Sequence, residues 1–238
     1  SLLNVGDRAW VRAPAESDAG FVGGTVVEAL GGGHVMFSTD DGAAQQRSGE
    51  ELMRVNDKAV SAQAEDVCAL PFFHEAGILK HIEGRFAQRY IYTWAGPVLI
   101  SINPCEPRPD LYGEAAHRQF QMAKERSAPP HLYAVAEAAF RGVASARWAN
   151  QAIIVSGESG AGKTFANREL IGYLAHRAAA VPLTGGATSE LLSEASVLLE
   201  GFGNACTAIN SNASRFARFA QLHVTSAGGI YKVGVAAF

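Results

Sequence analysis

The sequence has few cysteines, little net charge and no long apolar run. Its three cysteines stand far apart among 238 residues, and none belongs to a C-x-x-C pair. This spacing excludes a disulfide framework and a cysteine zinc site, and it is typical of reduced thiols. The seven histidines show no metal-ligand spacing. A formal net charge of −3 gives no electrostatic reason to expect nucleic acid or an anionic membrane as a partner.

Long hydrophobic segments are also missing. No apolar stretch approaches the roughly 20 residues that a membrane-spanning helix needs, and no signal peptide is visible. The composition, 48% hydrophobic and 18% charged, is that of a soluble globular protein. We therefore expect no membrane span, no nucleic-acid partner and a cytoplasmic location.

The first part of the sequence predicts a small antiparallel β-barrel. The runs RAWVR, FVGGTVVEAL and HVMFSTDDGAAQQ are short, β-rich and separated by Gly, Pro and Asp. Asp41-Gly42 between two of these runs is a hairpin signal. The polar segment 56–66 marks a boundary, which predicts one domain over residues 1–56 and a second over 57–238.

From about residue 67 helices and strands alternate, which predicts an α/β fold with a mixed sheet and flanking helices. The expected strands are a pair within 90–104 interrupted at Ala95-Gly96, then 151–156, 216–224 and 231–238. The expected helices and their apolar faces are 73–89 (Ile78, Ile82, Phe86), 114–126, 131–147 (Leu132, Val135, Ala139, Val143), a helix after residue 162 (Ala166, Leu170, Tyr173, Leu174) and one through Leu191, Ala195, Leu198 and Phe202.

A glycine-rich loop follows the expected strand 151–156. Its sequence GESGAGKT matches G-x-x-x-x-G-K-[ST] and comprises Gly157, Glu158, Ser159, Gly160, Ala161, Gly162, Lys163 and Thr164. Glycines let successive backbone N–H groups turn inward around an anion, and the positive end of the following helix points at the phosphates. Lys163 should reach the β- and γ-phosphates, and the Thr164 hydroxyl should ligate magnesium. A chance match in a glycine-rich chain is the alternative, but the flanking strand and helix patterns favour phosphate binding.

A second polar segment, 200–218, resembles a loop that closes over a γ-phosphate and its magnesium. Asn210, Asn212, Ser214 and Arg215 lie within six residues and offer two carboxamides, a hydroxyl and a guanidinium. The alternative is a solvated loop whose Ser and Asn residues serve turns. The neighbouring phosphate loop favours the first interpretation.

Together these segments resemble the myosin motor domain. GESGAGKT is similar to the family's phosphate loop, and LEGFGNACTAINSNASRFAR is similar to the stretch that includes switch I. IYTWAGPVLISINP resembles the strand pair that runs into the purine-binding loop, and PPHLYAVAEAAF the helix before the phosphate-loop strand. The segment 1–56 is similar to the small Src-homology-3-like barrel ahead of many myosin motors. A kinesin would have a serine-histidine ending in switch I instead of Arg-Phe.

The resemblance implies a role for each matching residue. Asn103 and Pro104 would begin the loop beside the adenine, and Tyr112 would close it. Gly157 to Thr164 and Asn210, with Asn212 nearby, would contact the nucleotide, and Ser214 would join Thr164 on Mg²⁺. Lys163, Ser214 and Arg215 would serve catalysis, Arg215 by pairing with a switch II glutamate.

The sequence also departs from the family's pattern. The purine loop, NPCEPRPDLY, is one residue longer than usual and acidic where a lysine is usual. Ala213 stands where the family has a serine implicated in handling the attacking water, and Phe165 replaces a glutamate. We therefore expect altered base selectivity and slowed hydrolysis.

The resemblance implies an ATP-binding N-terminal portion of an actin-based motor. No D-x-x-G-F-E switch II sequence occurs, and both ends of the chain look cut, so we expect a chain truncated before switch II. Actin filaments and light chains would be partners only of the complete, cytoskeleton-associated protein. The alternative is a degenerate, non-motor nucleotide-binding module. A generic phosphate-loop kinase or transporter ATPase fits the context less well.

Overall fold

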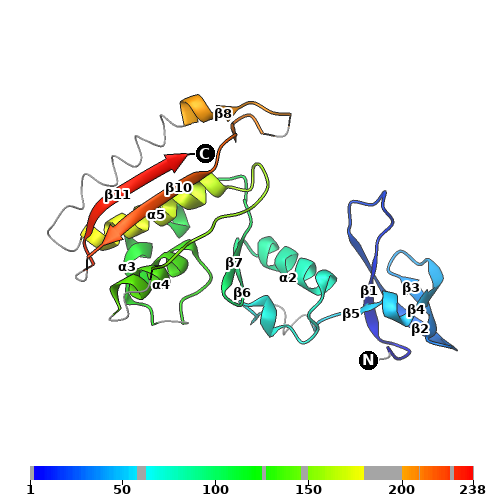
Figure 1. Ribbon diagram of the computed structural model, residues 1–238. Coiled ribbons are helices and arrows are strands. Elements are labelled where there is room, and N and C mark those ends of the chain that lie inside the picture. Colours follow the sequence, from blue (N-terminus) through cyan, green and yellow to red (C-terminus); the bar gives the residue numbers. More distant parts are fainter. Residues whose placement is uncertain are drawn as a thin grey trace. The chain divides into compact units, whose positions relative to one another are not determined.

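A computed structural model describes residues 3–57, 63–124, 127–145, 150–179, 200–208, 210–225 and 228–237 (Figure 1). The chain divides into two units, Ser1–Ile100 and Ser101–Phe238.

The first unit contains a five-stranded antiparallel sheet of order β4-β3-β2-β1-β5. Its strands are β1 (Arg8–Arg12), β2 (Phe21–Gly31), β3 (His34–Thr39), β4 (Ala44–Ser48) and β5 (Met53–Arg54), with a 3₁₀ turn, η1 (Gly49–Glu51), before β5. The hairpin predicted at Asp41-Gly42 is confirmed, because β3 and β4 pair around it and Gly42 has a φ of 91°. The three predicted β-rich runs therefore all form strands.

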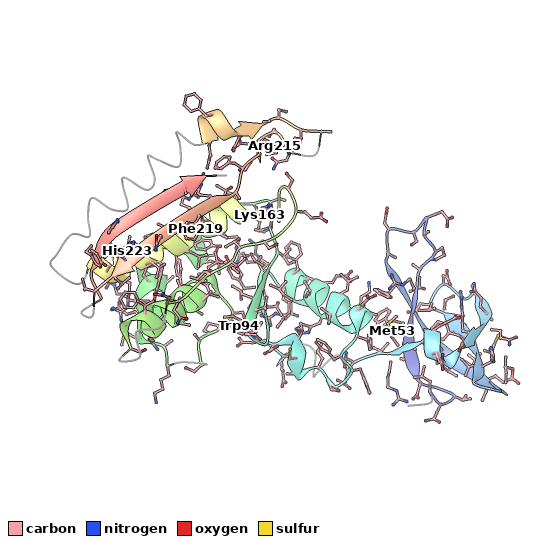
Figure 2. The ribbon with its side chains drawn as sticks, viewed as in Figure 1. Met53, Trp94, Lys163, Arg215, Phe219 and His223 are labelled. Atoms are coloured by element: carbon pink, nitrogen blue, oxygen red, sulfur yellow. The ribbon has the colours of Figure 1, made fainter. Side chains whose placement is uncertain are left out.

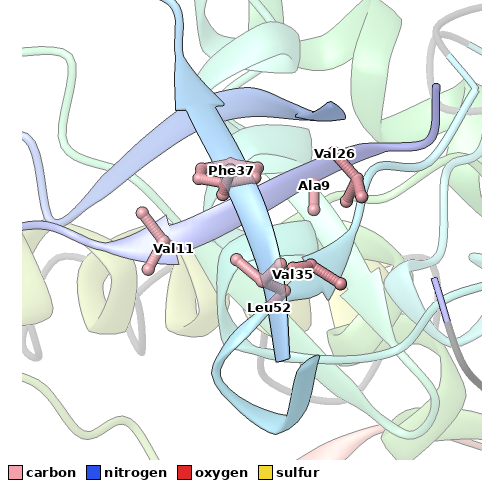
Figure 3. Packing of buried hydrophobic residues seen from close by; sticks show 6 residues of the cluster. All are labelled: Ala9, Val11, Val26, Val35, Phe37 and Leu52. Atoms are coloured by element: carbon pink, nitrogen blue, oxygen red, sulfur yellow. The ribbon is translucent and has the colours of Figure 1, made fainter. Parts of the chain in front are cut away.

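The core of this sheet comes from alternate residues of its strands (Figure 3). Ala9 and Val11 are buried on β1, while the residues between and beside them are more exposed, as the two-residue period of a strand requires. Phe37 is completely buried. A Cβ atom on Gly24 would lie 2.5 Å from the Phe37 ring, so no larger residue fits there without a shift. The full cluster is Ala9, Val11, Val26, Val35, Phe37 and Leu52.

A helix and a strand pair complete the first unit. The short 3₁₀ turn η2 (Val67–Ala69) precedes α2 (Glu75–Ala87), and β6 (Tyr92–Ala95) pairs with β7 (Val98–Ser101). These elements confirm the helix and the strand pair predicted for 73–89 and 90–104. Asn56 fixes the chain ahead of α2, because its side chain donates to the Phe72 carbonyl and accepts from the Phe72 N–H, at 2.9 and 2.8 Å.

The buried face of α2 differs from the predicted one. Ile78 and Ile82 are only half-buried and Phe86 is exposed, whereas His81 and Arg85 are buried. The other two buried residues of α2 are Ala76 and Gly77. An apolar pattern could not anticipate this, because a buried charge depends on acceptors elsewhere in the chain.

Three oxygens from outside α2 hold the guanidinium of Arg85. It donates to the Thr93 hydroxyl and to the carbonyls of Tyr92 and Ala64, at 2.9, 3.0 and 3.1 Å. Burial lowers the pKa of Arg85. Hydrogen bonds to neutral acceptors therefore compensate the cost of burying this charge.

The described residues of the second unit include three α-helices and two antiparallel strand pairs. The helices are α3 (Glu114–Met122), α4 (Leu132–Ala144) and α5 (Lys163–Ala179), with a 3₁₀ turn, η3 (Pro109–Leu111), ahead of α3. The strands are β8 (Asn204–Ala205) with β9 (Ala213–Ser214), and β10 (Arg218–Val224) with β11 (Ile230–Ala237). Helix α5 packs on α4 and also contacts β11 (Figure 1). The strands predicted for 216–224 and 231–238 are confirmed.

The predicted strand 151–156 and the single mixed sheet are not present in the described part of the chain. Residues 151–156 form no strand, and Ile154 is 87% exposed. After β5 the described residues contain three two-stranded sheets. A strand exists only beside a neighbour that accepts and donates its backbone hydrogen bonds. The apolar pattern of 151–156 indicated burial, but it contained no information about whether another strand lies beside this segment.

The predicted helices of the second unit are shorter than expected, and one face has shifted. The helices within 114–126 and 131–147 end at Met122 and Ala144. Most of the helix expected through Leu191, Ala195 and Leu198 lies outside the described residues, whereas its last residue, Phe202, is described and 93% exposed. On α5 the predicted Ala166, Leu170 and Tyr173 are buried, whereas the predicted Leu174 is half-buried. On α4 only Leu132 of the predicted face is buried. The remaining buried residues of this helix were not predicted; they are Tyr133, Ala136, Glu137 and Phe140.

A buried carboxylate explains the shifted face of α4. Glu137 is 4% exposed and accepts hydrogen bonds from Arg141, Tyr173 and Arg177, at 2.7, 2.9 and 3.1 Å. Tyr173 and Arg177 belong to α5, so one acidic side chain joins two helices. The Tyr133 and Tyr173 rings stack beside it with centroids 4.9 Å apart. The hydrogen bonds to the buried carboxylate and the packing of the aromatic rings together determine which side of α4 faces inward.

His131, the N-cap of α4, makes the stability of this unit depend on pH. Its Nδ1 accepts from the Tyr133 N–H at 3.0 Å, and its ring stacks on Phe120 with centroids 4.7 Å apart. Burial lowers the pKa of His131 from 6.5 to about 4. The folded state therefore holds this ring neutral where the unfolded chain protonates it. The free energy of unfolding is therefore highest above pH 6.5, where His131 is neutral in both states. It falls as the pH drops from 6.5 towards 4, because only the unfolded chain then takes up the proton.

We expect the native chain to lose about 2 kcal/mol of unfolding free energy from this group between pH 7 and pH 5. The variant His131→Asn keeps a side-chain cap but cannot titrate, so its loss over the same interval should be smaller by that amount. Urea unfolding followed by circular dichroism at both pH values measures the difference. An equal pH dependence in the two proteins would contradict this account.

Candidate phosphate-binding site

The glycine-rich loop leads directly into α5, whose first residue is Lys163. Gly160 and Gly162 have φ angles of 83° and 91°, in the left-handed region that residues with a Cβ rarely adopt. The Ala161 N–H donates to the Glu158 carbonyl at 3.2 Å and closes the turn. The loop is exposed, so its backbone and the N-terminal end of α5 are accessible to an anion.

The ammonium of Lys163 lies against this loop. Its Nζ donates to the carbonyls of Gly157 and Glu158, at 2.8 and 2.6 Å (Figure 2 labels Lys163). These bonds place a positive charge beside the loop and at the positive end of the helix dipole. Both features favour a polyanion at this position.

Asn103 fastens the loop from a second segment. Its Nδ2 donates to the Gly160 carbonyl at 2.7 Å, while its Oδ1 accepts from the Cys105 N–H at 2.9 Å. Pro104 between them is half-buried. The predicted purine loop is therefore hydrogen-bonded to the phosphate loop through its first residue.

Asn210 fastens the loop from a third segment. Its Nδ2 donates to the Ser159 hydroxyl at 3.2 Å. Thr207 fixes the backbone of Asn210, donating to its carbonyl and accepting from its N–H at 3.0 and 3.1 Å. The Asn212 N–H donates to Asn210 Oδ1 at 3.0 Å. Sequence reasoning missed Thr207, although a threonine three residues before an asparagine in a polar loop is a signal for a side-chain turn.

Ser214 and Arg215 lie further along the same segment. Ser214 pairs with Asn204 between β8 and β9. The backbone N–H of Arg215, whose position is labelled in Figure 2, donates to the Gly203 carbonyl at 2.9 Å. Within the described ranges, neither side chain is hydrogen-bonded to the phosphate loop, and Thr164 is exposed on the first turn of α5. The neighbouring Ala213 is buried at 1% exposure. The structure thus brings Asn103, Lys163 and Asn210 to one loop but does not join Ser214 or Arg215 to it.

Tyr112 belongs to an aromatic cluster beside the loop. Its ring centroid lies 5.2 Å from that of Phe165, 5.5 Å from His131 and 6.0 Å from Tyr133. Phe165 directly follows Thr164 on α5 and is 39% exposed. Sequence reasoning noted Phe165 only as a departure from a family pattern, not as a neighbour of Tyr112.

Neither a candidate membrane span nor a cluster of three or more metal-ligating side chains occurs within the described ranges of the chain. None of the helices there is long and apolar enough to cross a membrane. No group of three or more His, Cys, Asp or Glu residues in those ranges is placed to hold a metal ion.

A glycine-rich loop at a helix N-terminus, with a lysine and two asparagines bonded to it, is a candidate nucleotide-phosphate site and indicates a phosphate-loop protein. Comparison of the chain with known proteins identifies its family. The model of the myosin head (motor domain) matches residues 64–237. The chain is 34% identical over 227 residues to myosin-8 of Arabidopsis thaliana and 33% identical over 226 residues to its myosin-17, covering 95% of the chain in both cases. This chain therefore belongs to the myosin head family.

The match covers only a small part of those relatives. It spans 15% of the length of myosin-8 and 14% of myosin-17. Myosin-7 of the same plant is 37% identical over 166 residues, which are 70% of the chain and 10% of that relative.

Proposed function

We propose that this chain binds Mg·ATP and forms the nucleotide-binding part of an actin-based motor. The observation that carries the proposal is the convergence of two distant segments on the phosphate loop, through the bonds of Asn103 to Gly160 and of Asn210 to Ser159. Within the loop, Lys163 holds its ammonium against the carbonyl of Gly157. In the complete protein, hydrolysis of ATP would be coupled to actin binding, with light chains as further partners and a cytoskeletal location in the cytoplasm.

The residues present fit a magnesium–nucleotide complex. The loop from Gly157 to Thr164 offers backbone donors and an ammonium for the phosphates, and the exposed Thr164 hydroxyl offers a hard oxygen ligand. Magnesium, when bound, would neutralise charge on the β- and γ-phosphates. Asn210 and Asn212 would contact the nucleotide, Ser214 would become a second metal ligand, and Arg215 would pair with a switch II carboxylate. The last two roles require the segment after Asn210 to close further onto the loop.

The proposed function implies a more detailed assignment of the fold. We propose that residues 1–56 form the small Src-homology-3-like barrel and that 57–238 belong to the motor. Segment 151–156 and strands β10 and β11 would take part in one mixed phosphate-loop sheet of the complete head. Ile154 at 87% exposed and Phe219 at 56% support this, because large apolar side chains at such exposure favour cover.

Calorimetric titration of the full chain tests nucleotide binding. We expect saturable binding of ATP in the presence of magnesium, weaker binding when magnesium is chelated, and competition by ADP. Absence of saturable binding of both ATP and inorganic tripolyphosphate would refute the proposal.

A second candidate function is nucleotide binding without turnover, as in a non-motor interaction module. The buried methyl group of Ala213 favours it, because a hydroxyl that could relay a proton is missing from this position. Phosphate release measured with Mg·ATP distinguishes the two. If the native chain hydrolyses ATP and Ala213→Ser raises the rate roughly tenfold or more, the result favours the motor function. If neither protein hydrolyses ATP, the result favours the non-motor module.

A further inference from the structure

Two histidines of the second unit, one on α3 and one on α5, lie against each other. The ring centroids of His117 and His176 are 4.6 Å apart and their planes are tilted by 42°. His176 comes thirteen residues after Lys163, the first residue of α5, which is about 20 Å further along the helix axis. The pair is therefore separate from the candidate phosphate-binding site.

His117 is packed between two tyrosines and has a ring nitrogen that makes no hydrogen bond. Its ring lies edge-on to Tyr133 of α4 and Tyr173 of α5, with centroids 4.6 and 5.3 Å away. The tyrosine hydroxyls are engaged elsewhere, since Tyr133 donates to Glu169 and Tyr173 to Glu137, at 2.8 and 2.9 Å. Nδ1 of His117 is buried and has no hydrogen-bond partner among the described residues. A new partner would remove the free-energy cost of leaving this nitrogen unsatisfied.

The separation of the two rings fits two ligands of one metal ion. A metal–imidazole bond is about 2.1 Å long and the ring centre lies about 1.1 Å beyond the nitrogen, so each centroid is about 3.2 Å from the ion. Two rings bound at a right angle then have centroids about 4.5 Å apart, and two bound at the tetrahedral angle about 5.2 Å. The observed 4.6 Å lies in this range. Because His176 is exposed, its ring can turn to direct a nitrogen at the ion.

The electrostatic surroundings of the pair combine a neutral imidazole with an acidic neighbour. Burial, and after it the adjacent His176, lowers the pKa of His117, which keeps this ring in the neutral form that coordinates a metal. The Glu114 carboxylate, one turn earlier on α3, acts in the opposite direction and favours positive charge beside the ring. Arg177 follows His176 in sequence, but its guanidinium donates to the buried Glu137 at 3.1 Å.

We propose that His117 and His176 bind one transition-metal ion of the zinc and nickel class, with water completing its coordination, and that the ion fastens α3 to α5. Imidazole nitrogen suits Zn²⁺ and Ni²⁺, whereas Mg²⁺ and Ca²⁺ prefer oxygen ligands. The site has two protein ligands, where catalytic and structural zinc sites have three or four, so binding is reversible and of moderate affinity. Neither the phosphate loop nor a nucleotide contributes to it.

Calorimetric titration of the full chain with ZnCl₂ and with NiCl₂ tests this site. We expect saturable binding of both ions and no competition by excess Mg²⁺. His176→Gln and His117→Phe should each weaken Zn²⁺ binding roughly tenfold or more, because loss of even an outer partner of a metal ligand costs about 10–100-fold. The matched control is His34→Ala, which removes an exposed histidine from β3 of the first unit and should bind Zn²⁺ as the native chain does.

Urea unfolding gives a second readout, because an ion that binds only the folded chain raises its stability. Zn²⁺ should raise the urea midpoint of the native chain and of His34→Ala, but not that of either pair variant. Native Zn²⁺ affinity in His176→Gln, or a loss in His34→Ala as large as in the pair variants, would overturn the proposal. So would a native chain without saturable Zn²⁺ binding. His176 is exposed, so its substitution should leave the fold intact, which circular dichroism checks.

Discussion

Glu137→Ala is expected to destabilise the second unit by roughly 3 kcal/mol. The native carboxylate is 4% exposed and accepts from Arg141, Tyr173 and Arg177. Removing it leaves two guanidinium groups and a buried hydroxyl without their common acceptor, and opens a cavity between α4 and α5. Urea unfolding at pH 7 measures the loss.

Two variants make this result specific. Glu137→Gln keeps an acceptor oxygen but removes the charge, so it should fall between the native chain and Glu137→Ala. Glu114→Ala breaks an ion pair with Arg118 whose partners are 75% and 70% exposed, and should cost less than about 1 kcal/mol. A Glu137→Ala protein as stable as Glu114→Ala would show that the buried network does not hold α4 and α5 together.

Lys163→Ala is expected to weaken Mg·ATP binding by roughly a hundredfold or more. In the structure Nζ lies within hydrogen-bonding distance of the loop carbonyls of Gly157 and Glu158. A phosphate in the loop would take over as its partner, giving charge-assisted bonds at the end of a helix dipole. Because Lys163 is not buried, the substitution should leave the fold intact.

Lys80→Ala is the matched control for this prediction. Lys80 is a helical lysine of α2 that pairs with Glu83 at 2.9 Å and belongs to the first unit. Lys80→Ala removes one positive charge, as Lys163→Ala does, but should leave ATP affinity unchanged. Equal affinities of the Lys163→Ala protein and the native chain would remove the phosphate loop from the binding site.

Local patterns predicted most of the elements but not their assembly. The hairpin at Asp41-Gly42, the strands flanking Ala95-Gly96 and the buried face of α5 were predictable, because turn residues and periodicity act over a few neighbours. The faces of α2 and α4 were not. They depend on Arg85 and Glu137, polar residues whose burial is compensated by partners that are distant in sequence or on another helix. The strand predicted at 151–156 is absent for a related reason, because a strand needs a second segment that accepts and donates its backbone hydrogen bonds.

The candidate site shows the same division. The loop motif identified Gly157 to Thr164 directly, because its function depends on residues adjacent in sequence. The bonds from Asn103 and Asn210 span 57 and 51 residues, and only the fold could show them. The contact of Tyr112 with Phe165 was invisible for the same reason.

Amide hydrogen exchange with and without Mg·ATP tests the convergence of these three segments on one triphosphate most directly. Exchange should slow in peptides covering 157–164, 103–112 and 207–212 of the native chain, and remain unchanged in β1 to β5. The Lys163→Ala protein should show none of these changes at the same nucleotide concentration. Protection confined to other segments, or the same protection in both proteins, would contradict the assignment of the site.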